Sequence, residues 1–388
     1  MSDTTAILRS QSCASDTRQA VKEFHAGVQQ PDMELVVFFC SSMYDLEALA
    51  DEMNRLFTGV QVIGCTTAGE IGPAGYRDHS IAGVSFSSRA CSAVSGALSS
   101  LKDFEFSHGR ACVQDLLRQL ESRVDAVSPA NTFAFLLVDG LSVREEPVVR
   151  TLQAALGDIP LCGGSAGDDL KFEQTWVFHN GLFQSDCAAL ALINTALPFK
   201  VFKTQHFVCE DERLVVTEAD AAQRIVKEIN GLPAAEEYAR VLGVDVGELG
   251  PSSFATRPVV VVIDGTDYVR SIQKANPDGT LTFYCAIEDG LVLRVAHGQD
   301  IVRNLTQAFD TVSADIGPPM VTFGCDCILR NLEMTSTQTK QAAGDILRRN
   351  NTIGFSTYGE QFGGVHVNQT FTGIAIGRPR DEHHDPAG

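Results

Sequence analysis

Several features that define other classes of protein are missing from this sequence. Its longest apolar runs, such as residues 188–193 and 259–263, are far shorter than the roughly 20 residues that a membrane-spanning helix needs. The first residues show no basic segment followed by an apolar one, so no signal peptide is expected. We therefore expect a cytoplasmic protein without a membrane partner.

Blocks of basic residues are missing as well. The chain has 30 Lys and Arg against 49 Asp and Glu, which gives a formal net charge of −19 at pH 7. A surface of this sign repels a phosphate backbone, so nucleic acid is not an expected partner. The same surface would complement a basic patch on a protein partner.

Cysteine is present, but not in the spacing of a disulfide framework. Eleven is an odd number, and the residues are scattered, which is typical of thiols kept reduced in a cytosol. The one close pair, Cys325 and Cys327, has no second pair and no His-x-x-x-His to complete a zinc site. We expect these cysteines to be buried in strands.

The apolar pattern alternates between the periods of strands and helices. A βαβαβ order opens the chain, and hairpins follow, with Asn180-Gly181 and residues 276–279 (Asn-Pro-Asp-Gly) as turns. A single final strand is expected from His366 to Ile376. No internal repeat is evident.

This pattern predicts a mixed α+β fold with two domains. Their mixed, largely antiparallel sheets should pack together and be flanked by helices. We place the domains at residues 1–197 and 198–378, and expect residues 379–388 to be a disordered polar tail.

Two glycine-rich segments follow apolar strands. Residues 163–167 (Gly-Gly-Ser-Ala-Gly) match the G-x-S-x-G nucleophile pattern, but no helix is predicted after them, so a turn that requires glycine is the favoured interpretation. Residues 64–70 lack a phosphate-loop ending, although their amides could bind a small polar ligand. We expect both segments to line one concavity. The candidate ligand-binding residues are Gly64, Thr66, Thr67, Gly69, Glu70, Gly164, Ser165 and Asp168.

Ordered stretches along nearly the whole chain resemble the FIST family, a sensory module of bacterial signalling proteins and some eukaryotic F-box proteins. Residues 62–71 and 163–169 resemble signatures of its N-terminal domain. Residues 229–234 and 354–360 resemble the start and the ending of its C-terminal domain. The resemblance implies a sensor without enzymatic activity, with the N-terminal domain over residues 1–197.

Two further stretches, residues 202–207 and 323–330, resemble the haem-binding, nitric-oxide-sensing branch of that family. This resemblance implies a haem b cofactor and nitric oxide as the ligand. It also implies a histidine kinase or another signalling protein as the partner, with effects on cyclic-di-GMP signalling and biofilm formation. The chain could act alone or as a homodimer.

Three histidines are candidates for the haem iron, which needs one axial ligand and an apolar slot. His206 ranks first because strand alternation places it on one face with Phe202 and Val208, although a hydrogen-bonded core histidine is the alternative. His366 ranks second, since its predicted neighbours are polar. His297, before a helix, ranks third. The tail pair His383-His384 is expected to be solvated.

Two other functions remain open. One is a FIST sensor of a small metabolite, such as an amino acid, bound by the turns around residues 66–70 and 165–169. The other is a serine hydrolase that uses Ser165. A Soret absorption band separates the haem sensor from the metabolite sensor, and ester hydrolysis lost in Ser165→Ala would identify the hydrolase.

Overall fold

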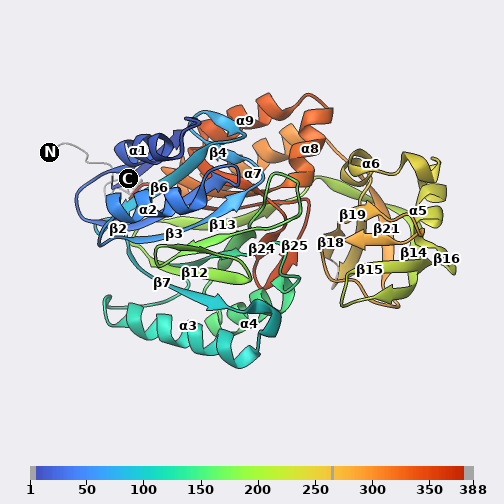
Figure 1. The fold of residues 1–388 in the computed structure, drawn as a ribbon, viewed down its shortest axis with the longest axis horizontal. Helices are drawn as coiled ribbons and strands as arrows, with labels where there is room; N and C mark the ends of the chain where they lie inside the picture. The colour runs from blue at the N-terminus through green and yellow to red at the C-terminus, as the bar shows by residue number, and fades with distance from the viewer. Residues whose placement is uncertain (1–5, 264–265, 380–388) are drawn as a thin grey trace, which may run out of the picture.

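The computed structural model describes residues 6–263 and 266–379 (Figure 1). Three α/β modules form a large body, and a β-rich segment inside the third module forms a smaller lobe. Helices flank mixed, mainly antiparallel sheets, which confirms the predicted mixed α+β fold. None of the helices in these ranges is long and apolar enough to span a membrane. Residues 380–388, with the tail histidines, lie outside the described residues.

The three modules share one basic order of elements: strand, helix, strand, helix, strand, two-stranded hairpin, strand. Module 3 adds a second helix after its second strand, and the smaller lobe lies between its first strand and first helix. Module 1 contains β1 (Ile7–Ser12), α1 (Thr17–Val28), β2 (Met33–Ser41), α2 (Leu46–Leu56), β3 (Gln61–Thr67), β4 (Glu70–Gly72), β5 (Gly75–Arg77) and β6 (Ile81–Ser87). Module 2 contains β7 (Ser92–Ser99), α3 (Phe106–Glu121), β8 (Thr132–Val138), α4 (Glu145–Leu156), β9 (Leu161–Ser165), β10 (Val177–His179), β11 (Leu182–Gln184) and β12 (Cys187–Asn194). Module 3 contains β13 (Phe199–Thr204), α7 (Ile301–Ile316), β22 (Val321–Cys327), α8 (Ile328–Ser336), α9 (Lys340–Arg349), β23 (Thr352–Thr357), β24 (Glu360–Phe362), β25 (Val365–Val367) and β26 (Phe371–Ile376).

Each module lends its hairpin to the sheet of another module. Hairpin β4–β5 of module 1 pairs with β23 of module 3, hairpin β24–β25 of module 3 pairs with β9 of module 2, and hairpin β10–β11 of module 2 pairs with β3 of module 1. The exchange is cyclic, so the connectivity has approximate threefold symmetry. The three six-stranded sheets are ordered β1-β6-β2-β3-β10-β11, β7-β12-β8-β9-β24-β25 and β13-β26-β22-β23-β4-β5.

One apolar core lies between the three sheets. Phe39 of module 1 stacks on Phe355 at a ring-centroid distance of 4.6 Å, and Phe135 of module 2 stacks on Phe323 at 4.8 Å. The central strands are buried on both faces, because the core covers one face and helices cover the other. Such strands have continuous apolar sequences, as residues 35–39 do.

The smaller lobe, here called the insert, comprises residues 207–298 between β13 and α7 of module 3. Its strands form a sheet around a separate core that includes Leu214, Tyr238 and Val295. Figure 1 shows the insert beside the body, with α6 near α8 and β18 and β19 on the side that faces the body. Its elements are β14 (Phe207–Asp220), β15 (Ile225–Ile229), β16 (Leu232–Pro233), α5 (Ala234–Leu242), α6 (Pro251–Thr256), β17 (Val259–Ile263), β18 (Thr266–Arg270), β19 (Ile272–Ala275), β20 (Leu281–Phe283) and β21 (Val292–Gly298).

Local turn chemistry agrees with the expectations. Asn180 and Gly181 have φ of 49° and 80° and connect β10 to β11, as a tight hairpin turn requires. Residues 276–279 likewise connect β19 to β20, with Gly279 at φ of 84°. The two predicted turns are therefore confirmed.

Other expectations differ from the structure. The expected single strand from His366 to Ile376 is wrong: it divides into β25 and β26, because Gln369 has a left-handed φ of 51°. Helix α8 was not predicted, and the threefold repeat was missed. The predicted boundary near residue 197 falls in the link between β12 and β13, yet sheets on the two sides share hairpins. The division into two domains stays a prediction.

Candidate functional site at the interface between the insert and the body

Buried polar groups gather where the insert meets module 3. The term interface cluster is used here for Arg270 and Ser271 of the insert with His366, Asn368 and Gln369 of module 3. Buried atoms of these side chains lack a hydrogen-bond partner among the described residues. They are Arg270 Nε and Nη1, Ser271 Oγ, His366 Nε2, Asn368 Oδ1 and Nδ2, and Gln369 Oε1.

Gly359 brings two members of the cluster together. A Cβ atom at this position would lie 2.1 Å from Cε1 of His366, 2.7 Å from its Nε2 and 3.1 Å from Nδ2 of Asn368. Both side chains therefore fill the space that any larger residue at 359 would need. On its other side, Nδ1 of His366 lies 3.1 Å from Nε2 of Gln361.

Arg224 of the insert joins the two lobes beside the cluster. Its Nη2 lies 2.7 Å from Oε2 of Glu145 and 2.5 Å from Oε2 of Glu146, at the start of α4. Its Nη1 donates to the carbonyl of Tyr284 at 2.5 Å. The second oxygen of Glu146 accepts from the amide of Ala286 at 2.6 Å, so these carboxylates hold two segments of the insert.

Burial controls the charge of this region. It lowers the pKa of His366 to about 4, with Glu146 opposing and Arg224 and Arg270 adding to the shift. The ring is therefore neutral near pH 7, although the nearby backbone of Tyr284 also opposes the lowering of the pKa. Burial raises the pKa of Glu145 to about 7 against the attraction of Arg224. The region thus presents a neutral imidazole, two amides and a cation.

His206, the first candidate for haem, lies in a different place and has both ring nitrogens engaged. Its Nε2 is 2.9 Å from both oxygens of Glu333, and its Nδ1 is 3.1 Å from Nη1 of Arg330. Arg330 in turn bonds Asp326 at 2.7 Å in the fully buried interior. An axial histidine needs a free nitrogen and an apolar slot. The surroundings of His206 in this structure do not fit haem.

The other expected iron ligands do not join His206. His366 belongs to the interface cluster, and half-exposed His297 lies 3.5 Å from Glu210 on the insert. Within residues 6–263 and 266–379 no group of three or more His, Cys, Asp and Glu side chains could hold a metal ion. The three histidines therefore do not share one site.

The two glycine-rich segments lie together, and a third segment from module 3 joins them; the expected concavity between them stays a prediction. Each is the end of a module's third strand. Gly163 is required by close packing, since a Cβ there would lie 1.9 Å from the carbonyl oxygen of Leu136. A ring of backbone hydrogen bonds links the three segments: Ala68 to Ser356 at 3.0 Å, Tyr358 to Ser165 at 3.3 Å, and Gly167 to Thr66 at 2.9 Å.

The candidate ligand-binding residues lie in this buried centre. Oε1 of Glu70 accepts from Thr67 at 2.5 Å, and its Oε2 accepts from the hydroxyl of Ser80 at 2.7 Å. Burial raises the pKa of Glu70 to about 8, so the carboxyl group is mainly protonated at neutral pH. Asp168 accepts three backbone amides of residues 172–174 and the hydroxyl of Tyr358. Gly64, Thr66, Gly69 and Gly164 are also buried. Ligand binding by these residues stays a prediction.

Ser165 lacks the surroundings of a nucleophile. Its side chain is buried, its hydroxyl accepts from Nε2 of Gln361 at 3.0 Å, and residues 166–176 form no helix after β9. A nucleophile elbow needs an exposed serine between a strand and a helix. The arrangement instead explains Ser165 as part of the packed centre.

Comparison with known families decides the assignment. The FIST N domain matches residues 34–232, and the FIST C domain matches residues 234–363. The chain belongs to the FIST family. FIST domains are sensor domains of signal transduction and are not known enzymes. The chain is also similar to the uncharacterized protein MJ1623 of Methanocaldococcus jannaschii, with 21% identity over 375 residues, covering 84% of this chain and 70% of that protein.

In this FIST chain the interface cluster was missed by reasoning from sequence, except for His366. A signal was available, because residues 63–70 (IGCTTAGE) and 353–360 (IGFSTYGE) have the same pattern. In that alignment, Tyr76 corresponds to His366 and Asp78 to Asn368. His366 of β25 and Asn368, which follows that strand, therefore differ from the equivalent residues of module 1. They lie at the place where the insert adds Arg270.

Proposed function

We propose that this FIST chain senses a small polar molecule bound at the interface cluster and reports it to a signalling partner. The single observation that carries the proposal is the concentration of buried, unpartnered polar atoms at the interface between the two lobes. Buried polar groups are nearly always hydrogen-bonded, and each one left unsatisfied costs about 1–3 kcal/mol. A ligand that satisfies several of them would bind favourably.

The chemistry of the cluster indicates the ligand class. N–H groups of Arg270 and the amide of Asn368 suit a carboxylate, for which charge-assisted hydrogen bonds are the strongest. The side-chain oxygens of Asn368 and Gln369 can accept from an ammonium group. Donors and acceptors in one place support an amino acid or a related zwitterion as the ligand.

Ligand binding at an interface would change how the insert sits against the body. The cluster contains residues from both lobes, so a ligand that contacts both favours one relative arrangement. The ion pairs of Arg224 with α4 hold a neighbouring part of the same interface. A partner such as a histidine kinase could read that arrangement through a basic patch on its surface.

Differential scanning fluorimetry with the twenty amino acids and small dicarboxylates tests the proposal. At least one compound should raise the melting temperature, since a ligand stabilises the state that it binds. In Gly359→Ala the new methyl group enters the space of His366, and affinity should fall at least tenfold. Gly247→Ala is the matched control, because nothing lies within 4 Å of its Cβ position.

A second variant covers the case in which Gly359→Ala folds poorly. Arg270→Met keeps the length of the side chain and removes the charge, so the affinity for carboxylate compounds should fall while the unliganded melting temperature changes little. Absence of any stabilising compound, or equal affinity in both variants and wild type, would refute the interface cluster as the sensory site.

Haem-based sensing of nitric oxide, with effects on cyclic-di-GMP signalling and biofilm formation, stays a prediction. The engaged nitrogens of His206 count against its first rank, while the unpartnered Nε2 of His366 favours that residue among the three. Protein produced with added haem should be examined by absorption spectroscopy. A Soret band that shifts with nitric oxide and disappears in His366→Ala or His206→Ala would replace the amino-acid proposal.

A further inference from the structure

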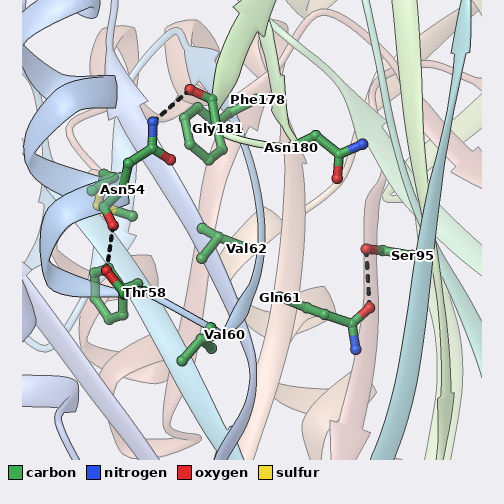
Figure 2. Close-up of a pocket in the computed structure, with 12 residues that line it drawn as sticks. Asn54, Thr58, Val60, Gln61, Val62, Ser95, Phe178, Asn180 and Gly181 are labelled. Atoms are coloured by element: carbon green, nitrogen blue, oxygen red, sulfur yellow. Dashed lines mark hydrogen bonds between the residues drawn. The ribbon is translucent and has the colours of Figure 1, made fainter.

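A groove on the body lies away from the interface cluster, between modules 1 and 2. It has a volume of about 540 Å³, within the usual range for small-molecule sites. The end of α2, the start of β3, the turn between β10 and β11, and β7 contribute to it. Figure 2 shows Gln61, Ser95 and Asn180 entering the same space from three of these segments.

The threefold repeat provides an internal comparison for this groove. By the strand registers, Ser95 of β7 corresponds to Arg9 of β1 and Val201 of β13. Arg9 is partly buried and donates to Oδ1 of Asn351 at 2.7 Å, while Val201 packs against the central core. Asn351 of module 3 corresponds to Gln61 of module 1. The contact of Arg9 with Asn351 is therefore equivalent to the contact of Ser95 with Gln61 at the groove. Module 2 alone places a small side chain here.

The lining has no ionisable side chain and offers both donors and acceptors. Gln61 is held in place, because its Nε2 donates to the carbonyl of Ala93 at 2.7 Å and its Oε1 accepts from Ser95 at 3.2 Å. Asn54 donates to the carbonyl of Gly181 at 2.9 Å. These contacts fix two amides, and the apolar groups of Phe57 and Val62 complete the lining.

The electrostatics of the groove disfavour charged ligands. The C-terminal end of α2 lies at the groove, and a helix C-terminus carries partial negative charge, which disfavours anions. The net charge of −19 acts in the same direction. A cation would find no carboxylate in the lining. An uncharged molecule with several hydrogen-bonding groups matches these conditions.

We infer that the groove between modules 1 and 2 is a second binding site, which takes an uncharged, hydrogen-bonding molecule of nucleoside or sugar size. The fixed amides of Gln61 and Asn54 orient the ligand, and Asn180 on the turn provides a further amide. The amides of Asn and Gln can form two hydrogen bonds with the edge of adenine. This site is independent of the interface cluster.

Isothermal titration calorimetry on the full chain tests the site with adenosine, uridine and glucose as separate probes. At least one should bind saturably, and adenosine 5′-monophosphate should bind no more tightly than adenosine. Ser95→Arg reproduces the residue that module 1 has at this position, so it should fill the groove and lower affinity at least tenfold. Ser99→Arg, exposed on the same strand, is the matched control and should bind as wild type does.

Asn180→Gly is a second variant for the case in which Ser95→Arg destabilises the fold. Glycine tolerates the left-handed φ of 49° at this position, so the turn is kept while the amide is lost, and affinity should again fall. The inference is overturned if none of the three probes binds, if binding survives both Ser95→Arg and Asn180→Gly, or if the monophosphate binds more tightly than adenosine.

Discussion

Arg224→Ala should strongly destabilise the protein, because it breaks the buried ion pairs between the insert and the body. The side chain of Arg224 is 7% exposed, and that of Glu145 is 2% exposed. Removing one partner of a buried pair costs about 3–5 kcal/mol, since the other charge stays buried without compensation. For a chain of this length, that loss corresponds to a fall in melting temperature of roughly 4–6 °C.

The loss should depend on pH. Burial raises the pKa of folded Glu145 to about 7, above the ordinary value of 4.5, while Arg224 opposes the shift. The folded state therefore holds a proton that the unfolded state releases, and the resulting stability is full below pH 4.5 and is lost as the pH rises through 7. Without Arg224 the pKa rises further, so the variant should lose more stability at pH 8 than at pH 6.

Urea denaturation followed by circular dichroism at both pH values measures this effect. Arg224→Ala with Glu145→Gln should recover part of the loss at pH 8, because glutamine carries no charge to bury. Arg118→Ala, which removes an exposed pair with Asp115, should leave the midpoint unchanged. A variant as stable as wild type, or a loss that is equal at both pH values and is not rescued by Glu145→Gln, would refute the reasoning.

Three further predictions concern the buried centre and the first histidine. Gly163→Ala should give largely insoluble protein, because its Cβ meets the carbonyl oxygen of Leu136 at 1.9 Å, whereas Gly247→Ala should purify as wild type does. Burial raises the pKa of Glu70 to about 8, so the folded state favours the protonated carboxyl group. Glu70→Gln should therefore fold well at pH 7 and should remove part of the fall in stability that wild type shows between pH 4.5 and 8. An unchanged pH profile in urea denaturation would contradict this. His206→Ala should lower the melting temperature by several degrees through loss of its bonds to Glu333, and scanning fluorimetry showing no change would contradict that structural role.

Local features of the fold could be predicted because nearby residues determine them. The turn at Asn180-Gly181 follows from backbone preferences at positive φ, and the buried strands follow from their apolar runs. Gln369 was missed, because a non-glycine residue at positive φ has no clear signature in a polar segment. Gln369 interrupts the strand that His366 was expected to begin. The residues that lie beside His366 therefore differ from those expected.

The candidate site was predicted only in part, since it depends on contacts between distant segments. His366 was recognised as a residue in a polar environment, but the charge of Arg270 acts on it from the insert, about a hundred positions earlier in the chain. The glycine-rich segments were expected to line one concavity, and the structure shows that they lie together. What they form is a packed centre, because the third strands of all three modules end there.

The sequence by itself determined the mixed α+β class, the two hairpin turns, the acidic charge and the resemblance to FIST proteins, because composition, periodicity and ordered motifs are properties of neighbouring residues. Tertiary structure alone decided the cyclic exchange of hairpins, the place of the insert, and the engagement of both nitrogens of His206. Each of these depends on which strand edges pair and which side chains become buried together. The packing of the whole core determines which distant strands pair. A short segment of sequence therefore does not specify its partner strand.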